Sequence, residues 1–208
     1  MNDLDVKFYD KKDLADIGID VARLLSLITK IDEDNGLLEE PYEDVVNRLT
    51  PVFDATENMW RAIMINGEIK GYWNCEALVD KYQKLIEEAK LKESYINIEN
   101  LKNSSQLLEG KNDLLFDSVC IHKDYQDHKL SGVIYKSIYD ALSKLPSQGI
   151  EVSDMWASIW SDQGVRFFTK LGFVLHKKNE HNGAIYRVSF YDFIKSLESM
   201  IEKYGLKD

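Results

Sequence analysis

Two stretches of the chain combine residue types in an order that suggests chemistry. The first runs from Val119 to Ser131 and the second from Ser161 to Phe173. In the first, an apolar segment typical of a strand leads into a short polar loop and then into a helical pattern. A helix N-terminus has four unpaired N–H groups and the positive end of the helix dipole, so it binds phosphate. The loop from Gln126 to Ser131 could therefore direct successive amides at a pyrophosphate.

Two side chains close to this loop are candidates for accepting a proton. Asp117 lies on the strand expected before the loop, and His122 lies at the end of that strand. Either group could act as a general base. Each also has a structural interpretation, Asp117 as a paired strand carboxylate and His122 as a solvated strand end. No nucleophile stands beside a base, so we expect no covalent enzyme intermediate.

Alternation and turn signals predict the strands that position these residues. Asn66-Gly67 and Asn182-Gly183 are the residue pairs that tight hairpin turns prefer. Gly71 inside a strand indicates a bulge or the close approach of another backbone. The expected strands are Asp5 to Tyr9, Trp60 to Ile65, Glu68 to Cys75, Leu114 to His122, Glu151 to Trp160, Phe173 to His176 and Ala184 to Phe190.

Apolar residues three and four apart predict the helices. One opens at Asp13 and continues through Ile28, and a short one follows Pro41 and is limited by Pro51. Ser161 is a good N-cap and Gly172 a good left-handed C-terminal residue for another. The remaining helices are expected over Glu76 to Leu91, Leu130 to Leu145, Ser161 to Leu171 and Phe190 to Tyr204, with an irregular segment over Lys92 to Asp113.

The two stretches together resemble the GNAT superfamily of N-acetyltransferases. The most specific part is the run Phe167-Phe168-Thr169-Lys170-Leu171-Gly172-Phe173. The other part is the loop, which in the family reads Gln/Arg-x-x-Gly-x-Gly/Ala after a strand. The resemblance covers Leu114 to Phe173, around a third of the chain, and the order of elements fits it over most of the rest.

The resemblance implies acetyl-CoA as cosubstrate and assigns residues to its parts. The strand end would hydrogen-bond the pantetheine arm through its backbone, and this strand would splay from Glu151 to Trp160 with the thioester in the gap. Ser161 and Phe168 stand where the family has further cofactor contacts. The implied pantetheine residues are Val119, Cys120 and Ile121, and the implied pyrophosphate residues are Gln126, Asp127, His128, Lys129, Leu130 and Ser131.

Several positions depart from the family pattern. Lys129 replaces the first loop glycine and Ser131 the second small residue. Lys129 could add a charge-assisted contact to a phosphate, or its side chain could obstruct the backbone approach that glycine permits. Ser161 replaces the usual Asn. Phe168 replaces a Tyr that in many relatives protonates the leaving thiolate, which a phenyl ring cannot do.

Composition restricts the function classes further. Lys and Arg number 26 against 36 Asp and Glu, a formal charge of −10, which argues against a nucleic-acid or anionic-membrane surface. The acidity is compatible with an amine substrate, although it usually serves solubility. Cys75 and Cys120 are isolated in apolar runs and are expected to be buried thiols, with no metal site. No stretch approaches about 18 apolar residues, so we expect a cytoplasmic protein without a membrane segment.

The sequence therefore predicts one α/β domain over residues 1–208, with an insertion over residues 76–113. The expected fold is a GNAT-like mixed sheet with a central splayed parallel strand pair, helices on both faces and a C-terminal helix. The expected reaction is acetyl transfer from acetyl-CoA to a primary amine of a small molecule or peptide. A non-catalytic binding protein of the same fold is the alternative. A homodimer, or a partner chain docked on the C-terminal helix, also stays open.

Overall fold

The computed structural model describes residues 4–56, 58–126, 128–179 and 183–206. Its strands form one mixed sheet of seven, in the order β1-β2-β3-β4-β5-β7-β6. The chain divides into two compact units. The first comprises Met1–Asn74, Ile96–Glu99 and Ser118–Lys129, and the second comprises Cys75–Tyr95, Asn100–Asp117 and Leu130–Asp208. Within the described residues, no helix combines the length and apolarity needed to cross a bilayer.

The first unit contains the predicted hairpin. β1 (Val6–Tyr9) pairs antiparallel with β2 (Trp60–Ile65), and β2 pairs antiparallel with β3 (Glu68–Glu76). In the turn between them Asn66 has a φ of 53° and Gly67 a φ of 85°. A type I′ turn needs positive φ at both positions, so the turn that Asn66-Gly67 predicts is confirmed.

Gly71 on β3 allows the backbone of β4 (Lys111–Ile121) to come close. A β-carbon at position 71 would lie 2.5 Å from the carbonyl oxygen of Cys120. The β2–β3 register also shifts between Ile63 and Met64, where Ile63 faces Gly71. The predicted bulge and the predicted close approach are therefore both present: Lys70 is the extra residue of the bulge, directly beside Gly71.

The helices of the first unit correct two predictions. The single helix expected from Asp13 to Ile28 is two helices, α1 (Lys11–Asp16) and α2 (Val21–Asp34). Gly18 adopts a φ of 77° between them, and the Asp20 side chain accepts a hydrogen bond from the Arg23 N–H and caps α2. An N-cap within an apolar periodic run starts a new helix in spite of the unbroken periodicity.

Pro51 does not end the next helix as predicted. α3 (Tyr42–Ala55) continues for four residues beyond it. A proline within a helix removes one N–H donor and crowds the preceding turn. The residues that follow offset this cost by burial, because Val52 and Phe53 are each only 1% exposed. Phe53 also packs against the buried Trp60 ring at 5.4 Å and accepts the indole N–H at its carbonyl.

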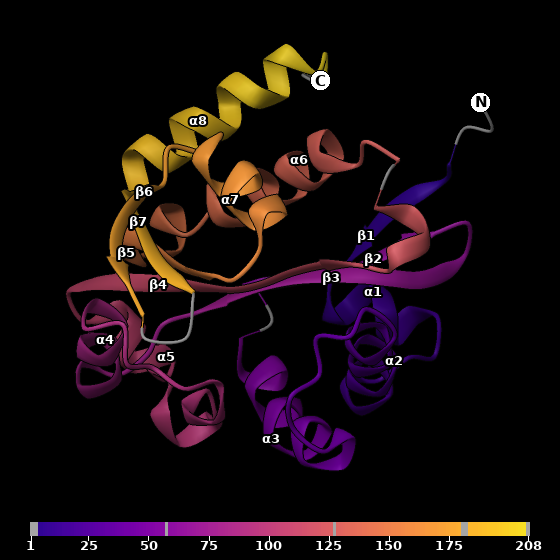
Figure 1. The fold of residues 1–208 in the computed structure, drawn as a ribbon, viewed down its shortest axis with the longest axis horizontal. Coiled ribbons are helices and arrows are strands. Elements are labelled where there is room, and N and C mark those ends of the chain that lie inside the picture. Colours follow the sequence, from indigo (N-terminus) through magenta and orange to yellow (C-terminus); the bar gives the residue numbers. More distant parts are fainter. Residues whose placement is uncertain (1–3, 57, 127, 180–182, 207–208) are drawn as a thin grey trace. The chain divides into compact units, whose positions relative to one another are not determined.

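The second unit contains the parallel strand pair. β4 pairs parallel with β5 (Glu151–Ile159), β5 pairs antiparallel with β7 (Ala184–Ser189), and β7 pairs antiparallel with β6 (Val174–Lys178). Figure 1 shows α6 (Ser131–Leu142), α7 (Asp162–Thr169) and α8 (Phe190–Lys203) on one side of these strands, with α4 (Asp80–Glu87) and α5 (Ser104–Leu108) on the other. The predicted arrangement of helices on both faces is confirmed for this unit.

The segment between β3 and β4 is more ordered at its ends than predicted. β3 extends to Glu76 and α4 occupies only the middle of the expected helix from Glu76 to Leu91. Lys111 to Asp113, expected to be irregular, already belong to β4. Between α4 and α5 lie two short 3₁₀ turns, η1 (Glu93–Tyr95) and η2 (Ile98–Asn100). Two further turns, η3 (Lys123–Tyr125) and η4 (Pro146–Gln148), precede and follow α6.

We predict that Gly71→Ala destabilises the protein by about 1–3 kcal/mol, the usual range for overpacking a tight site. The new methyl group would meet a backbone carbonyl oxygen, which cannot move aside as a side-chain end can. Urea unfolding followed by circular dichroism measures the change. Gly67→Asn is the matched control, because a β-carbon there has open space and Asn tolerates positive φ. Equal stability of the two variants would contradict the proposed role of Gly71.

Candidate functional site

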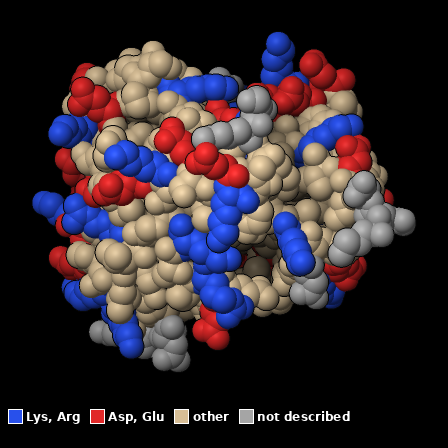
Figure 2. Space-filling model, turned by 90° about the horizontal axis from the view of Figure 1, so that it is seen from above, with Lys and Arg blue, Asp and Glu red and all other residues tan. Residues whose placement is uncertain are grey.

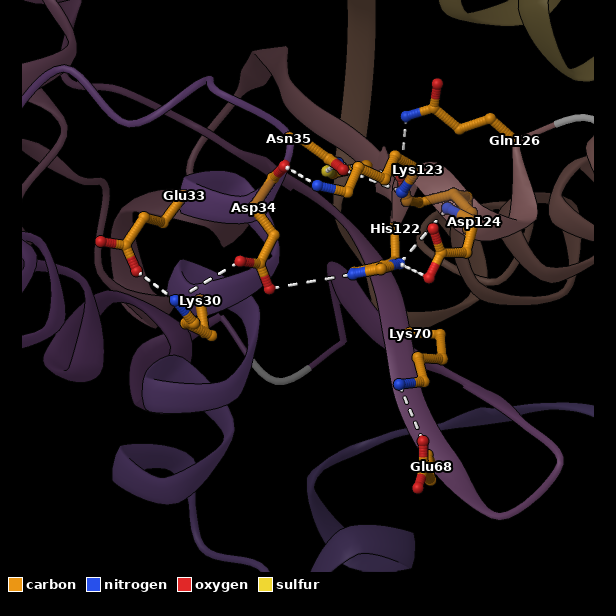
Figure 3. A network of polar contacts seen from close by, with 12 residues as sticks. Lys30, Glu33, Asp34, Asn35, Glu68, Lys70, His122, Lys123, Asp124 and Gln126 are labelled. Atoms are coloured by element: carbon orange, nitrogen blue, oxygen red, sulfur yellow. Dashed lines mark hydrogen bonds and ion pairs between the residues drawn. The ribbon is translucent and has the colours of Figure 1, made fainter.

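The last residues of β4 are fixed by the C-cap of α2. The Asn35 side-chain amide donates to the Ile121 carbonyl at 3.0 Å and approaches the Cys120 Sγ at 3.2 Å, and its oxygen accepts the Lys123 N–H at 2.8 Å. Figure 3 shows this side chain beside the end of the strand. Gln126 donates to the same Ile121 carbonyl at 3.0 Å. Both lone pairs of that carbonyl are used, so a pantetheine contact at Ile121 would have to use its N–H.

His122 lies between two carboxylates in the same network (Figure 3). Its Nε2 is 3.8 Å from Asp34 Oδ2, and its Nδ1 is 3.5 Å from Asp124 Oδ2. The Nδ1 atom also accepts the Asp124 N–H at 3.3 Å, which makes His122 the N-cap of η3. In the neutral ring this bond occupies the only lone pair and leaves the proton on Nε2. A role as base would require this cap to break.

A buried polar group adjoins the strand end and was not found from the sequence. The Tyr72 hydroxyl donates to Asp32 Oδ2 at 2.8 Å, and Cys120 lies beside the same carboxylate. Burial, and after it the charge of Asp32, raises the pKa of Tyr72 and of Cys120 well above their usual ranges. The thiol is therefore protonated at neutral pH, and Cys120 is no nucleophile. Its predicted burial is confirmed, as is that of Cys75.

The sequence carried only a weak signal for these partners. Asn35-Gly36 follows an apolar periodic run and is a usual helix ending, and Gly36 has a φ of 73°. Asp32 and Tyr72 have no such marker, because their contacts join residues 40 positions apart.

The loop after the strand keeps one backbone feature that explains a glycine in the family pattern. Lys129 has a φ of 55°, in the left-handed region where glycine is favoured. It is exposed, as is His128, whose ring lies 5.8 Å from that of Tyr125. Asp127 lies outside the described residues.

Figure 2 shows one face of the molecule, on which Lys and Arg side chains lie among acidic ones. This face therefore carries cationic groups although the net charge of the chain is −10.

The helix that follows begins at an apolar residue. Leu130 is the N-cap residue of α6, and its side chain makes no cap hydrogen bond. Ser131 lies 3.3 Å from the Tyr204 hydroxyl through its Oγ. A β-carbon at Gly132 would meet the Tyr204 ring at 2.8 Å, so this aromatic side chain packs directly on the first turn. Uncapped amides at a helix N-terminus are the groups that bind phosphate.

The parallel pairing of β4 and β5 stops before either strand ends. The last pair in the register is Phe116 with Ala157, although β5 continues to Ile159 and β4 continues beyond Asp117. This agrees with the splayed pair that the family resemblance implies. Asp117 is the residue of β4 that follows the last pair, and it is half-buried.

Ser161 and Phe168 have structural roles in α7. The Ser161 hydroxyl accepts the Gly164 N–H at 3.0 Å and is the helix N-cap, which confirms the structural interpretation of this residue. Phe168 is 7% exposed, and its ring packs against those of Phe116, Phe167 and Phe173 at 5.1 to 5.3 Å. Neither arrangement excludes a cofactor contact, since the Ser161 hydroxyl can still donate its own hydrogen.

Tyr135 cannot readily replace the missing tyrosine at position 168. It is fully buried, and its hydroxyl donates to the Phe167 carbonyl at 3.4 Å. Burial raises the pKa of Tyr135 above its usual range. Among residues 4–56, 58–126, 128–179 and 183–206, no three or more His, Cys, Asp or Glu side chains gather as a metal site would require.

We predict that Ser161→Ala destabilises the protein by about 1 kcal/mol, the usual cost of losing an N-cap. Ser161→Asp keeps a capping oxygen and should retain the stability of the original chain. Thermal unfolding of both variants measures the difference. An equal loss in the two would show that the cap is not what Ser161 contributes.

Comparisons with known proteins agree on the fold. No family model matches the sequence, and no curated protein matches it. The loading GNATL domain of CurA from Lyngbya majuscula aligns over 90% of this chain and 98% of its own, at 14% identity and a TM-score of 0.55. A protein from Pyrococcus horikoshii aligns over 89% and 98%, at 13% identity and the same TM-score of 0.55. A GNAT-family acetyltransferase from Streptococcus pneumoniae aligns over 90% and 99%, at 14% identity and a TM-score of 0.49.

The likenesses to the CurA domain and to the Pyrococcus horikoshii protein extend over nearly the whole chain, at low identity. They accompany a mixed sheet, a parallel β4–β5 pair and a C-terminal helix. The chain therefore has the GNAT fold that its two motifs predict.

Proposed function

We propose that this chain binds acetyl-CoA and transfers its acetyl group to a primary amine. The observation that supports this most directly is the end of the β4–β5 register at Phe116 and Ala157. Beyond that pair the two strands no longer follow one register, which is the arrangement that the family resemblance implies around the thioester. The first turn of α6, whose N-cap side chain makes no cap hydrogen bond, supplies a second feature suited to a phosphate-bearing cosubstrate.

The residues have separable roles in this proposal. The first-turn amides of α6 hold the pyrophosphate, and the Lys129 ammonium adds a charge-assisted contact. Asp117 takes the proton from the amine, with His122 as the second candidate. The amine nitrogen forms a bond to the carbonyl carbon, the C–S bond breaks, and the thiolate of CoA leaves. A thiol has a pKa of about 8.5, so its thiolate leaves without obligatory protonation.

Phe168, in the place of the family's usual Tyr, affects the expected rate of acetyl transfer. A general acid is worth roughly a hundredfold to ten-thousandfold. Phe168 supplies none, and the hydroxyl of Tyr135 is occupied. We therefore expect slow transfer. In the alternative, the chain binds CoA and does not catalyse.

We predict saturable binding of acetyl-CoA and of free CoA by calorimetric titration of the full chain. Lys129→Glu should weaken both by about tenfold or more, because a charge-assisted hydrogen bond is replaced by repulsion. Lys144→Glu is the matched control: it makes the same charge change at an exposed position beyond the other end of α6 and should have no effect. Lys129→Gly tests whether the backbone alone suffices. No binding by the original chain would overturn the proposed function.

We further predict that Phe168→Tyr raises the turnover of acetyl-CoA with an amine acceptor at least tenfold, by restoring a proton donor. The measurement is release of free CoA thiol over time, with the affinity for CoA determined in parallel. A variant that binds CoA as before and gains no rate would count against an acid at this position and would favour the non-catalytic alternative.

A further inference from the structure

A second polar site lies on the strand face that α4 covers, outside the residues assigned above. It comprises Gln83 on α4, Asp113 on β4 and Trp156 on β5, and we name it the Asp113 cluster. The Asp113 Oδ2 atom accepts the Trp156 indole N–H at 3.2 Å and the Gln83 amide N–H at 3.4 Å. Gln83 is only 9% exposed. Its Oε1 atom is buried and has no hydrogen-bond partner among the described residues.

An unpartnered buried amide oxygen is costly, and such a group needs a donor. Oε1 cannot obtain one by rotation of the amide, because the opposite orientation would direct this oxygen at the Asp113 carboxylate. The missing partner is therefore a hydrogen-bond donor to the Gln83 Oε1 atom, beside the Asp113 carboxylate.

The charges around the cluster favour a cation as that donor. Arg187 is a cation close to the cluster: its Nη2 atom lies 2.7 Å from Asp154 Oδ2, and its guanidinium lies 5.2 Å from the centre of the Trp156 ring. Its charge lowers the pKa of Asp113, but its ion pair is with Asp154. Burial raises the pKa of Asp113, and the charge of Asp154 adds to this effect. A cation at Asp113 would reduce both penalties, whereas an anion would increase them.

A bulge in β6 brings a further side chain to the cluster. The β6–β7 register shifts between Leu175 and Lys177, so His176 is the extra residue. Its ring packs edge-on against Trp156 at 5.0 Å, and its Nε2 lies 3.1 Å from the Glu87 carbonyl on α4. Bulges commonly redirect a side chain at functional sites. Here the bulge ties β6 to α4 beside the cluster.

Asp113 and the candidate base Asp117 lie on the same face of β4. Residues two apart in a strand share a face, and Leu115 lies between them. Leu115 pairs with Trp156 in the register, and both are buried. Four residues of extended strand span about 13 Å. This strand face thus has a carboxylate at each end of a buried apolar stretch.

We propose that the Asp113 cluster binds a primary ammonium group of the acceptor, at the end of that molecule remote from the amine that is acetylated. The inference rests on the proposed function and narrows the acceptor to one class, a molecule with two amino groups joined by an apolar spacer. An ammonium group has three N–H donors, enough for Asp113, for the Gln83 Oε1 and for one further acceptor. The segment between β3 and β4 would then form part of the acceptor site, because Gln83 lies on its helix α4.

Titration calorimetry with a matched pair of amines tests the proposal. Cadaverine and pentylamine have the same carbon chain, and only cadaverine has a second amino group. On the full chain, with CoA at saturation, we expect cadaverine to bind at least tenfold more tightly than pentylamine. Asp113→Asn should abolish this difference, because the side chain keeps its shape and loses its charge.

Asp80→Asn is the control variant. It makes the same change on α4, where the Asp80 side chain is 92% exposed, and should leave the preference for cadaverine intact. If Asp113→Asn does not fold, Gln83→Met removes the acceptor oxygen alone and should reduce the preference at least threefold. Equal affinities for the two amines in the original chain, or no binding of either, would overturn the proposal, as would a preference that survives in both Asp113→Asn and Gln83→Met.

The acetyl-CoA titration separates this proposal from the proposed function. If acetyl-CoA binds and the two amines are not distinguished, the ammonium site is wrong and the proposed function stands. If acetyl-CoA does not bind while cadaverine is preferred in an Asp113-dependent manner, the ammonium site stands and the proposed function fails.

Discussion

The early end of the β4–β5 register is the constraint on which the candidate site depends. The register ends at Phe116 and Ala157, and the backbone groups of the last residues of β4 make other hydrogen bonds. Asn35 and Gln126 supply them at the Ile121 carbonyl, and His122 donates its N–H to the Lys70 carbonyl on β3. The strand end is thereby held in place by groups from the chain itself. Because these bonds use the carbonyl of Ile121, they also determine which of its backbone groups a ligand can reach.

How far the sequence predicted the structure depended on the range of the interactions involved. The Asn66-Gly67 hairpin, the Ser161 cap and the positive φ of Gly172 are local features, and each was predicted correctly. The break before α2 was also local, but the apolar periodicity continued across it and hid the Asp20 cap. Pro51 shows the converse, since burial of the residues after it outweighed a local helix-breaking signal. The hydrogen bonds of Asn35 to the end of β4 join residues more than 80 positions apart, and the sequence marks only Asn35, as part of a usual helix ending.

The loop shows that a motif position can keep its backbone conformation and lose its usual residue. Lys129 adopts the left-handed conformation that explains glycine in the family pattern, although such a conformation costs a non-glycine residue roughly 1–2 kcal/mol. The fold therefore requires this turn independently of the side chain. Phe168 is the same kind of case, because its ring fills an aromatic cluster with or without a hydroxyl. The fold accounts for the backbone conformation of Lys129 and for the aromatic ring of Phe168. It does not require the glycine or the tyrosine hydroxyl that the family usually has at these positions.

The Asp113 cluster is different, because packing does not account for it. An apolar residue at position 83 would avoid a buried oxygen without a partner, and a neutral one at position 113 would avoid a carboxylate whose pKa burial raises. Buried polar groups that are incompletely satisfied are costly unless something else completes them. Here α4, the β6 bulge and Arg187 lie around one acceptor oxygen and one carboxylate, and the ion pair of Arg187 is with Asp154. Such an arrangement is unfavourable without a bound ligand. An ammonium group would donate a hydrogen bond to the Gln83 oxygen and would neutralise the charge of Asp113.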